Sequence, residues 1–149
     1  MKKIFLTLLV LVCLSGDAWG QNYTQKWNSV FRRTEFYDSR GTLQGWAKYN
    51  DVFDRMEYYD SRGNMIRYEK RNEVFNRTDV KDKYGNTQST RSYNQVFDRE
   101  DIKDAYGKTI GYKKWNDVFK RYEVYDSYGH LKGYYKWNDV FSRWEWHER

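Results

Sequence analysis

The sequence predicts an all-β protein, an antiparallel meander of stacked β-hairpins, on three observations. Asn recurs every 22 residues, at 28, 50, 72, 94, 116 and 138, and Val, Phe and Arg follow it at fixed spacings in every copy. Each copy holds two turn signals, separated by runs rich in Tyr, Val, Phe, Trp and Thr, which favour strands. After the N-terminal segment, Leu occurs only at Leu43 and Leu131, which argues against helices.

The first 20 residues have the three-part layout of a secretory signal peptide. Two lysines precede an apolar run over residues 4–14, and residues 18–20 place small side chains at the −3 and −1 positions of a cleavage site. That run is too short to span a membrane. We therefore expect a bacterial protein that is cleaved after Gly20 and exported to the periplasm or the cell exterior. Lipidation of Cys13 is the alternative, but its neighbours are larger than a lipidation motif requires.

Residues 21–149 are predicted to form a single β-hairpin repeat domain of about five and a half repeats. Its first turn has Asp at the first position and Gly at the fourth, as in Asp126 to Gly129, and predicts a three-residue loop that pairs Asp126 with His130. Its second turn lies at Asn138-Asp139, where a two-residue loop would pair Trp137 with Val140.

These two loops leave one residue per repeat unaccounted for. Together they advance the strand pairing by 21 residues, whereas the sequence repeats every 22. Because a one-residue slip turns every side chain to the other face, the extra residue needs either a β-bulge at the Val-Phe pair or a longer loop that includes the Val. With the bulge, we expect Glu123 and Tyr135 on one face and Tyr122 and Val124 on the other.

Neither predicted face is uniformly apolar, which argues against a two-sheet sandwich. Aromatic residues make up 20% of the chain and can stabilise a single sheet through cross-strand pairs. We therefore predict an elongated, twisted sheet of 11 or 12 strands. Curling or partial closure is an open alternative, since open sheets beyond about ten strands usually curl.

Part of the repeat resembles known hairpin repeats. Tyr-Asp-Ser-x-Gly at residues 37–41, 59–63 and 125–129 is similar to the core of YD (Rhs-type) repeats, and Gly-x-Leu-x-Gly-Tyr at 129–134 resembles bacterial MORN-like repeats. The Asn-x-Val-Phe-x-Arg half matches neither pattern, and Lys81 and Lys103 replace the expected Tyr. The resemblance implies a stacked-hairpin sheet used for surface presentation, encapsulation or protein contact, without catalytic residues.

Catalysis is not expected. A catalytic site needs a group of residues that occurs once in the chain, whereas the acids here recur from repeat to repeat. His130 and His147 are the only two His and lie apart from any predicted ligand or nucleophile. We therefore expect no enzyme activity, no cofactor and no metal site.

The recurring charged residues favour a structural role, as ion pairs, over a role in binding a ligand. Each recurring Arg is followed two residues later by an acid on the same strand face, which predicts a row of ion pairs; an anion-binding stripe is the alternative. The net charge of +6 is small and balanced by acids, so we do not expect nucleic-acid binding.

The recurring aromatic residues are the strongest candidates for a binding function. They favour a non-catalytic binding or structural module that contacts a protein of the cell envelope, with a cell-wall or capsular glycan as the alternative ligand. They are densest in the C-terminal units, and packing of the sheet itself, or of an end cap, is the competing explanation. The predicted binding residues are Trp115, Tyr134, Tyr135, Trp137, Trp144 and Trp146.

Overall fold

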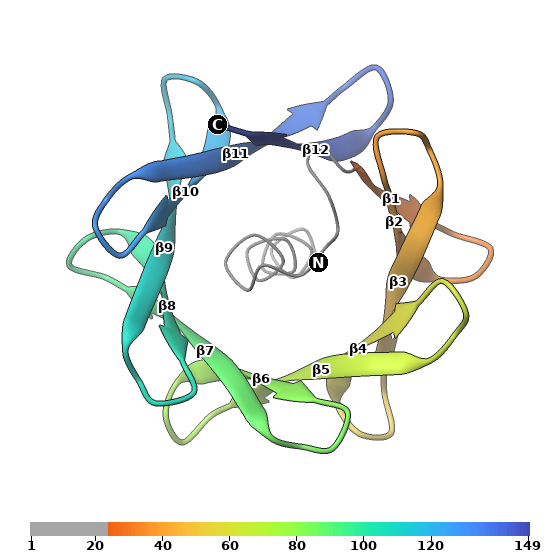
Figure 1. Cartoon of the computed structure of the whole chain (residues 1–149), viewed down its shortest axis with the longest axis horizontal. Coiled ribbons are helices and arrows are strands. Elements are labelled where there is room, and N and C mark those ends of the chain that lie inside the picture. The colour runs from red at the N-terminus through yellow and green to blue at the C-terminus, as the bar shows by residue number, and fades with distance from the viewer. Residues whose placement is uncertain (1–23) are drawn as a thin grey trace.

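A computed structural model describes residues 24–149 as twelve antiparallel strands in sequence order (Figure 1). The predicted signal peptide lies outside the described residues. Within those residues, no helix is long and apolar enough to cross a membrane. The strands are β1 (Thr24–Asn28), β2 (Arg33–Tyr37), β3 (Leu43–Asn50), β4 (Arg55–Asp60), β5 (Met65–Asn72), β6 (Arg77–Asp82), β7 (Thr87–Asn94), β8 (Arg99–Asp104), β9 (Thr109–Asn116), β10 (Arg121–Asp126), β11 (Leu131–Asn138) and β12 (Arg143–Glu148).

The sheet closes into a barrel, so the predicted elongated sheet is wrong. The first strand pairs with the last through Thr24 with Glu145 and Gln25 with Trp144, and Figure 1 shows the resulting ring. Closure has a physical basis: strand twist accumulates over twelve strands, and joining the two ends satisfies edge N–H and C=O groups that an open sheet would expose. The all-β class and the sequential antiparallel hairpins are confirmed.

The Asp-Gly loops have the predicted geometry. The N–H of Asp126 donates to the carbonyl of His130 at 3.0 Å, and the N–H of Gly129 donates to the carbonyl of Asp126 at 3.1 Å. Gly129 has φ 86°, a left-handed conformation that glycine adopts without strain. The Asp126 carboxylate also accepts the N–H groups of Tyr128 and His130, both at 2.9 Å. The three-residue loop is therefore confirmed.

The Asn loops are longer than the two-residue loop at Asn138-Asp139. Asn138 pairs with Arg143, which leaves a four-residue loop over 139–142 that contains both Val and Phe. The longer-loop alternative is thus correct. Its last residue, Ser142, has φ 49°, and the equivalent residue of the other five loops has φ of 49–52°.

A bulge does occur, but on the other strand. Val124 pairs with Gly133 and Tyr125 pairs with Leu131, so Lys132 has no opposite residue. This shift reverses the faces of the return strand: Tyr135 lies opposite Tyr122, and Tyr134 lies opposite Glu123. The predicted grouping of Glu123 with Tyr135 is therefore wrong.

The corrected register gives the barrel two different walls. The inner wall carries two apolar clusters. One contains Phe36, Ala47 and Tyr58, on β2 to β4. The other, on β8 to β12, contains Ile102, Val124, Tyr135 and Trp146. The outer wall carries the recurring Arg and its acid, which are followed by Tyr37, Tyr59 and Tyr125 in three of the six repeats.

Candidate functional site

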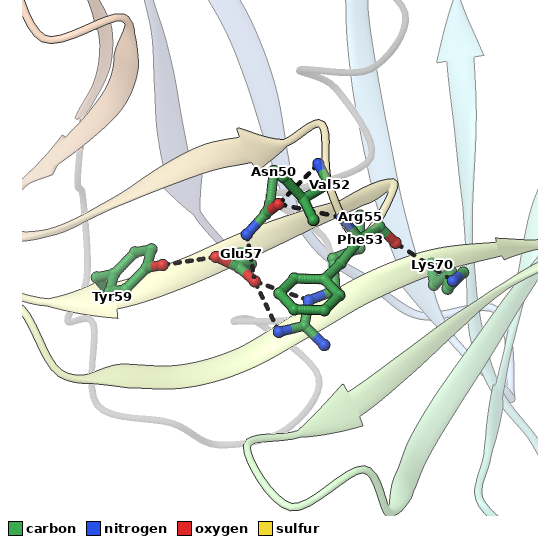
Figure 2. Close-up of polar contacts among 7 residues, drawn as sticks. All are labelled: Asn50, Val52, Phe53, Arg55, Glu57, Tyr59 and Lys70. Carbon is green, nitrogen blue, oxygen red and sulfur yellow. Dashed lines mark hydrogen bonds and ion pairs between the residues drawn. The ribbon is translucent and has the colours of Figure 1, made fainter.

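Each Asn loop is held by the Asn that precedes it. The Oδ1 atom of Asn50 accepts the N–H groups of Val52 at 3.0 Å and Phe53 at 3.1 Å, and Nδ2 donates to Glu57 at 3.2 Å (Figure 2). One side chain therefore caps the loop and joins it to the outer wall. Asn suits this position because its amide offers both an acceptor and donors. This explains why Asn recurs at the start of every loop.

The recurring Arg and Glu complete the network. Arg55 contacts Glu57 through Nε and Nη2, each at 2.7 Å, and the Tyr59 hydroxyl donates to the same carboxylate at 2.6 Å. The Arg55 guanidinium lies 4.7 Å from the Phe53 ring centroid and 4.1 Å from that of Tyr68, so it is held between two aromatic rings.

Electrostatics keep the buried Glu57 ionised. Burial alone would raise the pKa of this carboxyl group, but hydrogen bonds from Tyr59, Arg55 and Asn50 and the charge of Arg55 outweigh it, and the pKa is lowered. Burial, which is the largest cause, and the hydrogen bond to Glu57 together raise the pKa of Tyr59 to about 12.

The predicted row of ion pairs is confirmed along the whole outer wall, with N–O distances of 2.6–2.9 Å. The pairs are Arg33–Glu35, Arg55–Glu57, Arg77–Asp79, Arg99–Asp101, Arg121–Glu123 and Arg143–Glu145. Each Arg is thus neutralised within its own repeat, which leaves these columns with little capacity to bind an external anion.

The network presents apolar side chains to solvent. In all six Asn loops the Val is 83–87% exposed, and the Phe beside it is 56–64% exposed. In an antiparallel meander alternate loops lie at the same end of the barrel, so all six Asn loops belong to one end. We call these six Val and six Phe residues the apolar rim. Exposed apolar side chains gathered in this way are typical of interaction sites.

Aromatic residues adjoin the apolar rim from the strand ends. Trp27, Tyr49, Tyr93, Trp115 and Trp137 each precede a loop Asn and are 37–61% exposed. Several are held by a loop acid: Trp115 Nε1 donates to Asp117 at 2.8 Å, and the hydroxyls of Tyr49 and Tyr93 bond to Asp54 and Asp98. The polar atoms of these three residues are thus bonded to the loop, while much of each ring remains exposed.

The six predicted binding residues do not form one surface. Tyr135 and Trp146 are buried in the inner wall, with ring centroids 4.5 Å apart. Trp137 lies at the rim and contacts the half-buried Trp144 edge-to-face at 5.5 Å. Tyr134 lies on the outer wall, where it stacks on His147 at 4.9 Å and under Arg121 at 4.0 Å.

Only Trp115 and Trp137 of that set are therefore exposed beside the apolar rim. Any role of these residues in binding remains a prediction. The rim Val and Phe are not among the predicted binding residues, because the repeat period alone explains them as part of a bulge or of a longer loop. The recurrence of Val and Phe in all six Asn loops is the feature of the sequence that could have indicated this surface.

The described residues show no group of three or more His, Cys, Asp or Glu that could hold a metal ion. His130 is largely exposed and contacts Asp126 at 3.1 Å, within its own hairpin loop.

Comparisons with known proteins concern the fold alone. No protein-family model and no curated protein matches the chain. The X-ray structure of a protein from Arabidopsis thaliana is similar, with a TM-score of 0.62 over 86% of this chain and 80% of that chain. At 12% sequence identity this likeness shows a shared fold and carries no statement about activity.

Proposed function

We propose that this chain is an exported, non-catalytic binding module that contacts a protein of the cell envelope through its apolar rim. One observation carries the proposal: the same loop exposes a Val by 83–87% six times at one end of the barrel. A Val side chain that stays in solvent gains little free energy from burial, whereas the Asn, Arg and Glu around it are all bonded.

The neighbouring side chains suit a protein partner. Trp115 and Trp137 supply large, half-exposed rings, and the exposed Lys114 and Lys136 lie one residue before them. Trp and Tyr beside an apolar surface are the residues that dominate binding energy at protein interfaces. The resemblance to YD and MORN-like hairpin repeats supports the same kind of role, which is contact and presentation.

Site-specific photo-crosslinking in the source cell tests this proposal. A photoreactive amino acid replaces Val52 or Val118 at the apolar rim. In matched controls it replaces Arg62 or the 84%-exposed Tyr128, which lie in the Asp-Gly loops at the other end. We expect a discrete crosslinked species from the two Val positions only. Equal crosslinking from both ends, or none from either, would refute the proposal.

Glycan binding is the second candidate, favoured by the aromatic residues around the same end. Titration with peptidoglycan fragments or capsular oligosaccharides should then quench Trp fluorescence, and Trp115→Ser should weaken that quenching. Quenching by sugar without crosslinking to protein would replace the first proposal by the second.

A further inference from the structure

The apolar rim is a closed ring, which limits the kind of partner that can cover it. Because the first and last strands pair, the Asn loops follow one another around one end of the barrel, and the last loop stands beside the first (Figure 1). The six loops are residues 29–32, 51–54, 73–76, 95–98, 117–120 and 139–142. A partner that covers all of them must present a ring of similar width, and a second copy of this chain presents one.

The loops that carry the rim have one fixed shape. In all six, the N–H of the Phe donates to Oδ1 of the loop Asn, at 3.1–3.3 Å. Neighbouring hairpins are also joined, since Lys70 Nζ donates to the carbonyl of Phe53 at 3.2 Å. A surface that is already ordered loses little conformational entropy on binding, so the rim suits contact with another ordered surface.

The exposed area of the rim matches what a stable dimer needs. A fully exposed Val side chain offers roughly 60–100 Å² and a Phe ring roughly 150–250 Å². With their exposed fractions, the six Val and six Phe side chains present at least about 800 Å² in each copy. A standard protein interface buries about 800 Å² on each partner, so close contact between two rims reaches this size.

The last residue of each loop differs in charge around the ring. All six of these residues are exposed, and in ring order they are Arg32, Asp54, Asn76, Asp98, Lys120 and Ser142. The two positive charges thus stand on either side of Ser142, and the two negative charges stand on either side of Asn76.

This order makes the ring complementary to itself. A two-fold axis perpendicular to the barrel axis sets two rims face to face and reverses the loop order in one of them. Six loops allow six such registers. In one register the Arg32 loop faces the Asp54 loop and the Lys120 loop faces the Asp98 loop, each twice by symmetry. The other five registers either oppose only two of the four charges or bring like charges together.

The other charges of this end do not cancel the pattern. Counted over all four residues, the loop that ends at Arg32 has a charge of +1 and the loop that ends at Asp54 has a charge of −2. The two loops without a charged last residue face each other and each contain one acid, but one of these, Glu73, lies 3.7 Å from Arg71. Lysines on the strands behind the loops offset the surplus of loop acids: Lys26, Lys48, Lys70, Lys114 and Lys136.

We propose that two copies of this chain associate end to end through their apolar rims, with the Arg32 loop of each copy against the Asp54 loop of the other. This inference rests on the proposed function of the rim and names its protein partner as a second copy, which reaches the same compartment. A two-fold contact covers the rims of both copies, so the assembly stops at two chains.

Sedimentation equilibrium of the purified mature chain tests the association. We expect twice the mass of one chain at about 1–100 μM. The double variant Val52→Ser with Val118→Ser alters only exposed side chains, so it should keep its circular dichroism spectrum and weaken the dimer about tenfold or more. The matched control, Tyr84→Ser with Tyr128→Ser at the other end of the barrel, should leave the dimer intact. A wild-type chain that stays monomeric over this range would overturn the inference.

Charge reversal tests the register. Arg32→Asp and Asp54→Arg should each weaken the dimer about tenfold or more, because each brings two pairs of like charges together. The double variant carrying both changes should regain the wild-type affinity. Loop geometry tolerates the changes, since Arg and Asp already occupy this position with φ of 49–52°. A double variant that dimerises no better than the single variants would show that the register is wrong.

Crosslinking from Val52 in the source cell separates this inference from the proposed function. A crosslinked species of twice the chain mass supports both. A discrete species of another mass keeps the protein-binding role of the rim and overturns the second copy as its partner. The absence of any crosslinked species refutes both.

Discussion

The outer wall of the barrel repeats with the sequence, whereas the inner wall does not. On the outside, Asn50, Arg55 and Glu57 make contacts that recur around the ring with nearly the same distances. On the inside, equivalent positions hold residues as different as Ala47, Arg91 and Tyr135.

The two walls differ because the outer contacts form within one hairpin, whereas the inner contacts join different hairpins. A local network that serves one hairpin can be copied unchanged, because its partners lie within the same 22 residues. The interior is shared by all the hairpins, so each repeat must fill a different part of one common volume.

The largest effect is expected for the inner core. Trp146→Ala removes a buried ring that packs on Tyr135, and it should lower the free energy of unfolding by about 3–5 kcal/mol. Urea denaturation followed by far-UV circular dichroism measures this change. The exposed Val140→Ala is the control and should change stability by less than about 0.5 kcal/mol. Similar losses from the two variants would remove the distinction between core and rim.

A smaller loss is expected for one outer network. Asn50→Ala removes the loop cap and one donor to Glu57, and it should cost about 1–2 kcal/mol. Asn116→Ala should cost about as much, and the double variant should lose the sum, because distant sites behave independently. Denaturation of the two single variants and the double variant checks this; a strongly non-additive result would mean that the repeats do not act as separate units.

Acid should weaken the outer wall. The pKa values of Glu35, Glu57 and Glu123 are lowered from 4.5 in the folded protein, in spite of burial, by hydrogen bonds from the neighbouring Tyr, Arg and Asn. A lowered folded pKa gives stability that is complete above the unfolded pKa and is lost as the pH falls through the folded value. Unfolding free energy should therefore decline as the pH drops from about 5.

Replacement of a network carboxyl group provides the control for this pH effect. Glu57→Gln should have a shallower decline than the wild type, since one of the contributing groups no longer titrates. A variant whose acid sensitivity equals that of the wild type would show that these carboxyl groups do not govern the transition.

The smallest effect concerns local opening. The inner wall of β6 and β7 has Thr78 opposite Arg91, whereas the equivalent pair of β10 and β11 is Tyr122 opposite Tyr135. With less apolar burial, the amides of residues 77–94 should exchange faster than those of 121–138. Hydrogen exchange read by mass spectrometry measures this; uniform protection would show that closure makes the barrel open as one unit.

Local signals determined much of this protein. The period of 22, the strand composition and the Asp-Gly turn predicted an all-β chain of antiparallel hairpins, and the Arg–acid spacing predicted the outer ion pairs. Each of these features depends on residues within a few positions of one another, or on directly paired strands. A sequence pattern records such relations because the same residues must recur whenever the same local structure recurs.

The tertiary structure alone decided the closure, the faces and the candidate sites. The pairing of Thr24 with Glu145 joins residues that no repeat places together. The bulge at Lys132 puts Tyr135 on the inner face opposite Tyr122, whereas a bulge at the Val-Phe pair predicts Tyr135 on the face of Glu123. Arg91 appears in the sequence as an irregular member of a repeat, and only the closed ring buries it beside Glu69. Burial is a property of the whole enclosed volume, which is why a repeating local pattern could not predict it.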